Sequence, residues 1–335
     1  MDLALAQHGG NLAAAREAYP LAPEPWLDLS TGISPHAYPF TPLPVETFTR
    51  LPDPAAIAAL EASATRFYGA HDAGTVVAAA GTQALIQWLP RLLPARRVGI
   101  LGFTYGEYAR CFAAAGAEVT VCDGVDALAD QDVGVIVNPN NPDGRRVPLA
   151  ALIDLAGRLA AHGGTLVVDE AFADLDEAAS LVPRLPSSGA IVLRSFGKSF
   201  GLAGVRLGFA IAAPPLIEAI RLAIGPWAVS GAAVAIAEAA FADRAWLGAT
   251  RARLRSDGAE LDRIIEQAGF TLLGGTPLFR LARHDDAVGI FRLLAQAGIL
   301  VRRFTQEPAW LRFGIPGSEA ERRRLAAALA GDPAG

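Results

Sequence analysis

The sequence predicts an α/β protein in which a mainly parallel central sheet forms a large domain and a smaller α+β domain follows. Between residues 74 and 214, short apolar runs alternate with stretches of helical periodicity. Strands that alternate with helices form parallel sheets covered on both faces. After Pro214 and Pro215 the helices and strands become segregated. We expect an N-terminal arm with part of the small domain (1–50), a large domain (51–225) and a small C-terminal domain (226–335).

The elements of the large domain follow from their local patterns. The first 50 residues are rich in proline but also apolar, which favours an arm that wraps over another surface. Asp53 and Pro54 open a helix over residues 55–68. Buried strands are then predicted at residues 75–80, 97–101, 118–122, 133–137, 165–168 and 191–193, with helices at 82–93 and 149–162.

The C-terminal part has a different order of elements. A long helical region at 232–268, with a break near Asp257, precedes a strand-turn region at 270–281. A helix at 286–297 then leads to a strand at 299–302. The last helix starts at Ser318, where the pattern Ser-Glu-Ala-Glu is a capping box.

The composition excludes several classes of protein. The chain has 335 residues, of which 52% are hydrophobic and 19% charged, so it can bury a large core. A net charge of −5 without a basic stripe argues against nucleic-acid binding. The two cysteines and the scattered histidines have no metal-ligand spacing, which predicts neither a metal site nor a disulfide framework. Without a visible signal peptide or an apolar run of about 20 residues, we expect a cytoplasmic protein with no membrane contact.

The stretch from Ile191 to Gly208 carries a strong chemical signal. An apolar strand ends near Ser195 and Lys198, and a glycine-rich loop that contains Arg206 follows. A lysine amine can attack a carbonyl to form a Schiff base, while a hydroxyl and a guanidinium hold a phosphate. The glycines allow the backbone to approach a bulky cofactor. Taken alone, this stretch also fits a solvated lysine in a loop.

Two further stretches follow predicted strands, where ligands bind in parallel sheets. Gly81, Thr82 and Gln83 open a helix whose free N–H groups can bind an anion. Tyr105 follows the next strand and can stack on a flat ring, although a core aromatic fits the same position.

Polar residues also follow the two strands before the lysine. Two Asn-Pro steps within residues 138–144 turn the backbone and present the amide of Asn141 toward the strand ends. Asp169 follows a buried strand, where a carboxylate is costly to ionise unless a cation pairs with it.

Together these motifs resemble the fold-type I pyridoxal-phosphate (PLP) enzymes, and within them the aminotransferase class I/II family. NPNNPDG at 138–144 is similar to the family's NPxNPTG, DEAF at 169–172 to its DEAY, and SFGKSFGLAGVRLG at 195–208 to its Ser-x-x-Lys…Gly-x-Arg-x-Gly signature. The resemblance covers about residues 25–330. It implies the fold-type I fold, PLP as cofactor and a homodimer with its sites at the two-fold interface.

The resemblance implies a role for each matching position. Lys198 forms the Schiff base with the cofactor aldehyde, and Asp169 keeps the pyridine nitrogen protonated so that the ring is an electron sink. Asn141 hydrogen-bonds the ring hydroxyl, and Tyr105 stacks on the ring. The implied phosphate-binding group consists of Gly81, Thr82, Gln83, Ser195 and Arg206.

The N-terminal arm points to a phosphorylated amino-acid substrate. Its start, His8-Gly9-Gly10-Asn11, and the segment WLDLSTGISP at 26–35 resemble the arm of the L-threonine O-3-phosphate decarboxylases of cobalamin biosynthesis, which are relatives of the histidinol-phosphate aminotransferases. His8 and the glycine amides can bind a substrate phosphate. The further cations implied for the substrate are Arg302 or Arg303 for its phosphate and Arg312, in WLRFGIPG, for its carboxylate.

Three positions depart from these patterns. Phe172 and Leu51 stand where relatives have tyrosines, so one hydrogen bond to the ring hydroxyl and one contact to the neighbouring subunit's phosphate are lost. Residues 32–34 lack an asparagine that relatives carry in the arm. None of these changes removes the lysine, the aspartate or the arginine, so we expect catalysis to survive.

We therefore predict PLP-dependent decarboxylation of L-threonine O-3-phosphate to (R)-1-aminopropan-2-yl phosphate and CO₂. The alternative is an aminotransferase acting on histidinol phosphate or a similar phosphorylated amine, because the cofactor residues do not reveal which bond at Cα breaks. The joint presence of Lys198 and Asp169 argues against a non-enzymatic binding module. A nicotinamide enzyme is disfavoured because no Gly-x-Gly-x-x-Gly follows the first strand.

Overall fold

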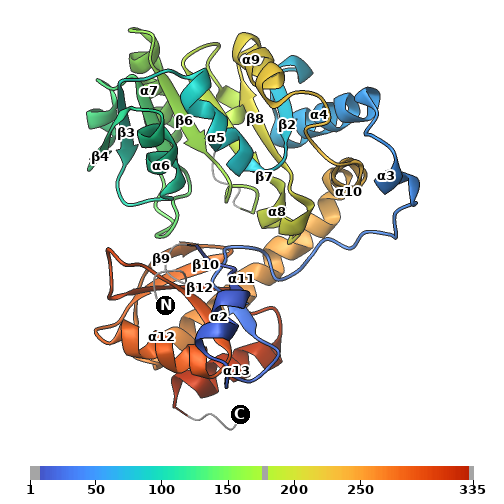
Figure 1. Cartoon of the computed structure of the whole chain (residues 1–335). Helices are drawn as coiled ribbons and strands as arrows, with labels where there is room; N and C mark the ends of the chain where they lie inside the picture. The colour runs from blue at the N-terminus through green and yellow to red at the C-terminus, as the bar shows by residue number, and fades with distance from the viewer. Residues whose placement is uncertain (1–7, 176–179, 332–335) are drawn as a thin grey trace. The chain divides into compact units, whose positions relative to one another are not determined.

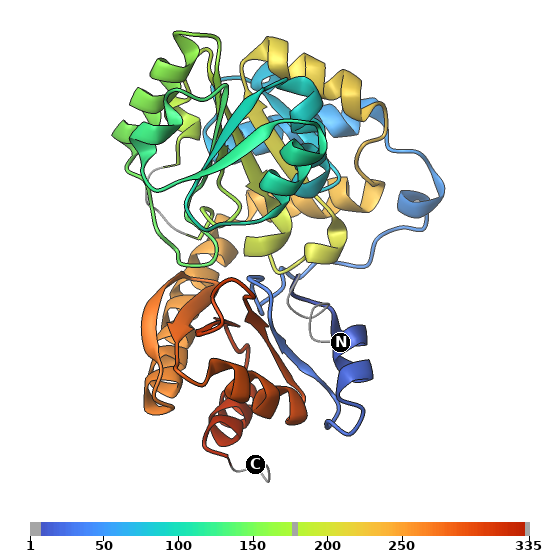
Figure 2. The same cartoon turned by 60° about the vertical axis from the view of Figure 1, so that its left-hand side comes forward.

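The computed structural model describes residues 8–175 and 180–331. Contacts within the chain divide it into two units, shown in Figures 1 and 2. The large unit comprises residues 37–141 and 145–247. The small unit comprises the described residues up to His36, residues 142–144, and the described residues from Gly248 onward.

A seven-stranded sheet forms the centre of the large unit, in the order β2-β8-β7-β6-β5-β3-β4. β8 runs antiparallel to its neighbours β2 and β7, and the other neighbouring strands are parallel. The strands are β2 (Val76–Ala79), β3 (Arg97–Leu101), β4 (Glu118–Cys122), β5 (Val133–Val137), β6 (Thr165–Asp169), β7 (Ala190–Ser195) and β8 (Gly208–Ala212).

Helices cover both faces of this sheet (Figure 1). Successive strand residues point to opposite faces, so Val76 belongs to the hydrophobic core on one face and Val77 to the core on the other. The first core also contains side chains of α4, α7 and α10, and the second contains those of α5, α6 and α9. The helices of this unit are α3 (Glu46–Thr49), α4 (Pro54–Tyr68), α5 (Thr82–Leu92), α6 (Glu107–Ala114), α7 (Leu149–Ala160), α8 (Phe196–Ser199), α9 (Pro214–Ile224) and α10 (Gly231–Ala242).

The small unit is built on a five-stranded sheet in the order β1-β11-β12-β10-β9. β1 pairs in parallel with β11, so the N-terminal segment adds an edge strand to a sheet made by the C-terminal part (Figure 2). The strands are β1 (Leu27–Leu29), β9 (Thr271–Thr276), β10 (Phe279–Arg283), β11 (Ile299–Arg303) and β12 (Trp310–Gly314). The helices are α2 (Leu12–Ala18), α12 (Ala287–Gln296) and α13 (Glu319–Leu329), and α11 (Arg244–Gln267) contains the boundary at 247/248.

The boundaries of the units differ from the expected ones at 50/51 and 225/226. The structure places them at 36/37 and 247/248 because residues on both sides of the expected boundaries pack into the large unit. Tyr38 lies edge-on against Trp246, with ring centroids 5.1 Å apart, and also contacts the ring of Phe200. α10 packs against α4 in the same unit.

The long helical region is also interrupted at a different place. The break lies at Asp243, between α10 and α11, where the carboxylate of Asp243 accepts from the N–H of Trp246. The helix continues through Asp257 and Gly258. A Cβ at position 258 would clash with the guanidinium of Arg280, so the glycine makes room for that side chain rather than ending the helix.

Several elements of the described chain were not expected from the sequence: α2, β1, α3, α6, α8, β8, α9 and β12. β8 and β12 are each five residues long, and such short strands show little periodicity. β8 follows a glycine-rich loop, and β12 follows a loop that contains a proline. Within the described residues, no helix combines the length and apolarity that crossing a membrane would need.

Candidate active site

One pocket of the large unit lies at the carboxyl ends of its parallel strands. All nine residues that the sequence assigns to the cofactor line this pocket. The position follows from the topology, because loops that leave neighbouring parallel strands meet at the same edge of the sheet. The lining residues are Gly81, Thr82, Gln83, Tyr105, Val137, Asn141, Asp169, Ala171, Phe172, Ser195, Gly197, Lys198, Ala203, Arg206 and Leu207.

One end of the pocket has the features of a phosphate site. Thr82 is the first residue of α5, where backbone N–H groups have no partner within the helix. Arg206 adopts a left-handed conformation with φ of 54°, which is uncommon for a non-glycine residue and places strain at this loop. Gly81 has φ of 83°, and a Cβ there would lie 2.8 Å from a nitrogen of the Arg206 guanidinium. The glycine therefore leaves room for the cation, and Ser195 adds a hydroxyl to the same lining.

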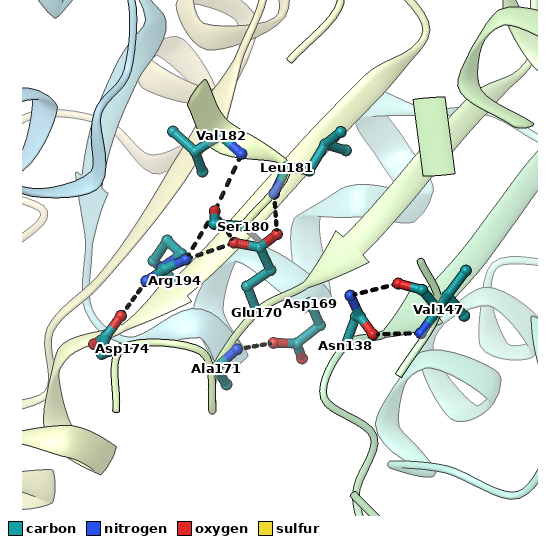
Figure 3. Close-up of polar contacts among 10 residues, drawn as sticks. All are labelled: Asn138, Val147, Asp169, Glu170, Ala171, Asp174, Ser180, Leu181, Val182 and Arg194. Atoms are coloured by element: carbon teal, nitrogen blue, oxygen red, sulfur yellow. Dashed lines mark hydrogen bonds and ion pairs between the residues drawn. The ribbon is translucent and has the colours of Figure 1, made fainter. Parts of the chain in front are cut away.

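Asp169 ends β6 and is 4% exposed. Its Oδ1 accepts from the N–H of Ala171 at 3.0 Å (Figure 3), and its Oδ2 accepts from the hydroxyl of Tyr108 at 2.8 Å. Burial raises the pKa of Asp169, and the hydrogen bond from Tyr108 partly opposes this effect. Burial and the nearby Asp169 in turn raise the pKa of Tyr108, so its hydroxyl stays protonated. A buried carboxylate that faces a pocket fits a ligand carrying a positive charge.

Asp169→Asn is expected to stabilise the cofactor-free protein at neutral pH by on the order of 1 kcal/mol. The pKa of Asp169 is higher in the folded chain than in the unfolded chain, because burial penalises the ionised form. Protonated Asp169 therefore contributes its full stability to the folded protein below the pKa that it has in the unfolded chain. This contribution is lost as the pH rises through the higher pKa that Asp169 has in the folded chain. A neutral amide avoids this loss, so the gain over wild type should disappear below about pH 4.

The measurement is urea unfolding of both proteins between pH 4 and pH 8. Asp130→Asn, which changes an exposed carboxylate, is the control and should change little. A constant difference between Asp169→Asn and wild type across this range would contradict the explanation.

Lys198 lies in α8, directly after β7, and is the only lysine in this sequence. Its Nζ lies 5.7 Å from the centroid of the Phe172 ring, so an aromatic face borders the amine. Phe172 is 5% exposed and lines the pocket. The amine thus lies in a pocket with an apolar wall, and a lysine amine is a side chain that can act as a nucleophile.

The three asparagines of the Asn-Pro motif have separate roles. Asn138 bonds to the backbone of Val147 through both ends of its amide, at 2.9 and 3.4 Å (Figure 3). Asn140 donates to the carbonyl of Phe103 at 3.0 Å and accepts from Thr104 at 2.6 Å. Both therefore hold loops together, whereas Asn141 lines the pocket.

Gln83 and Tyr108 show what local patterns do not reveal. The family resemblance implies that Gln83 contacts a phosphate, whereas in the structure its side chain bonds to the side chains of Tyr105 and Glu107. Tyr108 was not assigned a role, although its hydroxyl bonds to Asp169. The two residues of that bond are 61 positions apart, so no local motif reports it.

The arm residues predicted to bind substrate lie in the small unit. The N–H of Gly10 donates to Oγ of Ser30 at 2.7 Å, and a Cβ on Gly9 would clash with the carbonyl oxygen of Ser30. Asn11 caps α2, with Oδ1 accepting from the N–H of Ala14 at 3.1 Å. His8 is exposed. The glycines therefore permit close contact with Ser30, and contacts of this segment with substrate stay a prediction.

The three predicted substrate arginines do not share one face of the small sheet. Arg312 on β12 pairs in register with Arg302 on β11, so these two lie on the same face. Arg303 is on the opposite face and lines a separate small cavity beside α12. Arg312 donates to the carbonyl of Ser30 at 2.7 Å, and burial together with Arg302 lowers its pKa to about 9. Arg302 and Arg312 thus form the adjacent cation pair.

Comparisons with known proteins identify the family. Residues 44–329 match the model of the aminotransferase class I and II family. The chain is 43% identical to a threonine-phosphate decarboxylase from a Sinorhizobium species, over 96% of this chain and 97% of that protein. It is 41% identical to a threonine-phosphate decarboxylase from Pseudomonas aeruginosa, over 97% of each chain.

Solved structures agree on the fold. A histidinol-phosphate aminotransferase from Sinorhizobium meliloti, in complex with pyridoxal-5'-phosphate, superposes with a TM-score of 0.81 at 20% identity, over 96% of this chain and 94% of that one. An L-threonine-O-3-phosphate decarboxylase from Porphyromonas gingivalis superposes with a TM-score of 0.76 at 18% identity, over 91% of this chain and 98% of that one. By its fold, by its motifs and by the match over most of its length, this chain belongs to the aminotransferase class I and II family.

Proposed function

We propose that this protein is a PLP-dependent decarboxylase that converts L-threonine O-3-phosphate to (R)-1-aminopropan-2-yl phosphate and CO₂, a step of cobalamin biosynthesis. The observation that carries this proposal is the likeness to two threonine-phosphate decarboxylases at 43% and 41% identity over almost the whole chain. A histidinol-phosphate aminotransferase from Citrifermentans bemidjiense matches 92% of the chain at 30% identity.

The pocket fits the PLP cofactor of this family. Asp169, buried and with a raised pKa, faces the pocket and suits the protonated ring nitrogen. Arg206, Ser195 and the first N–H groups of α5 suit the phosphate. Lys198 supplies the amine for the aldehyde. When bound, PLP supplies an electron sink for the bond that breaks at Cα of the amino acid.

The residues of the pocket hold the cofactor and move protons. Asp169 would keep a proton on the ring nitrogen of bound PLP, and the bonds from Tyr108 and Ala171 set the orientation of its carboxylate. Phe172 and Ala171 provide an apolar wall that limits water near the amine. Decarboxylation needs a proton at Cα after CO₂ leaves, and Lys198 Nζ is a candidate to deliver it.

The small unit supplies cations of the kind that the substrate needs. Arg312 and Arg302 lie on one face of its sheet, and Arg312 keeps a planar guanidinium suited to a carboxylate. The positive charge of Arg302 lowers the pKa of Arg312, because two neighbouring guanidinium groups repel each other. A substrate with more than one negative charge would relieve this repulsion. We assign the substrate carboxylate to Arg312 and the substrate phosphate to Arg302 with the arm at His8–Asn11.

The deciding experiment measures CO₂ release from L-threonine O-3-phosphate by the PLP-loaded protein without a 2-oxoacid. Release of CO₂ that is absent in a Lys198→Ala control supports the decarboxylase. Absence of CO₂, together with transamination of histidinol phosphate once 2-oxoglutarate is added, would assign the aminotransferase activity instead. The aminotransferase is the second candidate because the family model and the histidinol-phosphate aminotransferases among the relatives support it.

We also propose that the protein is a homodimer, as is typical of this family. Val45, Phe48 and Leu51 are 64%, 68% and 67% exposed, and they lie within seven residues around α3 in the large unit. A cluster of large exposed apolar side chains marks an interaction surface, and a second copy of the chain is the partner that the family suggests.

Phe48→Glu is expected to shift the protein from dimer to monomer by at least about tenfold in dissociation constant, because it places a charge in an apolar interface. Sedimentation equilibrium of the wild type and the variant measures this shift. Val121→Glu, on the exposed side of β4, is the matched control because Val121 is 61% exposed but lies on a different edge of the large unit. A wild type that is monomeric at micromolar concentration would refute the proposal.

A further inference from the structure

Gln83 has two parts that point to different tasks. Its backbone N–H lies in the first turn of α5, at the phosphate end of the pocket. Its side chain bonds to two other side chains: Oε1 accepts from the hydroxyl of Tyr105 at 3.0 Å, and Nε2 donates to Oε2 of Glu107 at 2.8 Å. The amide therefore bridges a buried carboxylate and an aromatic residue of the pocket.

Glu107 decides the orientation of this amide. The carboxylate is 4% exposed and also accepts from Arg110, with Nε 3.1 Å from each oxygen and Nη2 in contact with Oε2. A carboxylate paired with a guanidinium is ionised and only accepts hydrogen bonds. The NH₂ group of Gln83 must therefore face Glu107, and its carbonyl oxygen must face Tyr105.

The hydroxyl of Tyr105 is the hydrogen-bond donor that the carbonyl oxygen of Gln83 requires. Burial, together with the charges of Glu107 and Asp169, raises its pKa to about 12, so the hydroxyl keeps its proton. The far end of the phenol is tethered by Gln83, and its ring lies edge-on to Tyr108, with centroids 6.5 Å apart and planes at 81°. A tether at the hydroxyl and a ring contact at the side together restrict the plane of the Tyr105 ring.

We propose that Gln83 is a positioning residue: with Glu107 and Arg110 behind it, its side chain fixes the Tyr105 ring for stacking on the flat ring of the cofactor. The Gln83 side chain thus contributes to cofactor binding through Tyr105 and not through the phosphate, which the backbone of the same residue faces. This inference rests on the proposed PLP binding and deepens it.

A comparison of two ligands separates the two roles of Gln83. PLP and pyridoxal share the ring and the aldehyde but differ in the phosphate. Gln83→Leu is expected to raise the dissociation constants of PLP and of pyridoxal by the same factor, about tenfold, which corresponds to the loss of one well-placed hydrogen bond. Ser195→Ala is the control for a phosphate contact and should weaken PLP binding while leaving pyridoxal binding almost unchanged.

A double-mutant cycle tests whether Gln83 acts through Tyr105. Tyr105→Phe keeps the ring but removes the hydroxyl, so it should weaken both ligands and lower the visible circular dichroism of the bound ligand as Gln83→Leu does. In the Tyr105→Phe background, Gln83→Leu should cost less than about twofold, because the bond that it removes is already absent. Urea unfolding of each variant shows whether the fold is kept.

Two results would overturn the positioning role. One is a Gln83→Leu variant that loses affinity for PLP but not for pyridoxal, which would make the side chain a phosphate ligand. The other is an equal loss in the wild-type and Tyr105→Phe backgrounds. If the wild-type protein binds neither ligand, the proposed function itself fails, and this inference fails with it.

Discussion

Lys198→Ala is expected to lower the rate of CO₂ release from L-threonine O-3-phosphate by at least about 1,000-fold. The amine borders the Phe172 ring within the pocket that also contains Asp169. Proton transfer by a positioned side chain alone contributes about 10²–10⁴-fold, and the variant also loses the covalent bond to the cofactor. Single-turnover release of labelled CO₂ measures the effect without a contribution from product dissociation.

The single lysine of this sequence makes the control for this prediction unusually direct. Borohydride reduction of the PLP-loaded wild type should attach one cofactor, and peptide mapping should find it on Lys198. Lys198→Ala has no side-chain amine left and should not be labelled within the chain. Labelling of the wild type elsewhere, or a variant that retains more than about a tenth of the activity, would remove Lys198 from the chemistry.

Arg194→Leu is expected to lower the free energy of unfolding by about 3–5 kcal/mol, the range for breaking a buried ion pair. Arg194 on β7 is 4% exposed and pairs with Glu170 and Asp174, which are also buried (Figure 3). Burial by itself would lower the pKa of Arg194, but the two carboxylates outweigh burial and raise it. Without the guanidinium, two carboxylates remain buried without their cation.

Urea unfolding of the cofactor-free protein at pH 7 measures this loss. Arg158→Leu breaks an exposed pair with Asp126 and should cost much less, because water already solvates both groups. Replacing Glu170, Asp174 and Arg194 together by Gln, Asn and Met should recover most of the stability. A loss below about 1 kcal/mol in the single variant would show that the cluster is not a stabilising unit.

The same cluster lies next to the site. Glu170 follows Asp169 at the end of β6, and Arg194 precedes Ser195 at the end of β7. The ion pair therefore ties together the ends of two strands that carry pocket residues. The carboxylate of Glu170 also accepts from the N–H of Leu181 at 2.7 Å, so the cluster includes a backbone contact as well.

The lining of the pocket could be predicted because its residues stand in short motifs after strands. Asn141, Asp169 and Lys198 each follow an apolar run that is too short for a helix, and such runs form neighbouring strands of a parallel sheet. The carboxyl ends of those strands lie at one edge of the sheet, so local patterns were enough to predict that these distant residues meet in one pocket.

Contacts between distant side chains could not be predicted in the same way. The side chain of Gln83 depends on Glu107, which is 24 residues away, and that of Asp169 depends on Tyr108. Arg302 and Arg303 are adjacent in the sequence, and only their register in β11 shows which of them shares a face with Arg312. The boundary at 247/248 lies inside a helix, where periodicity carries no signal of a change of unit.

The sequence by itself therefore determined the fold class, the strands that end at the pocket and the residues that line it, because these depend on patterns over a few neighbouring residues. Only the tertiary structure decided which side chains fulfil those tasks. Hydrogen-bond partners, burial and pKa depend on the distance between groups that are far apart along the chain, as for Asp169 between Tyr108 and the pocket. That distance is set when the helices pack on the sheet.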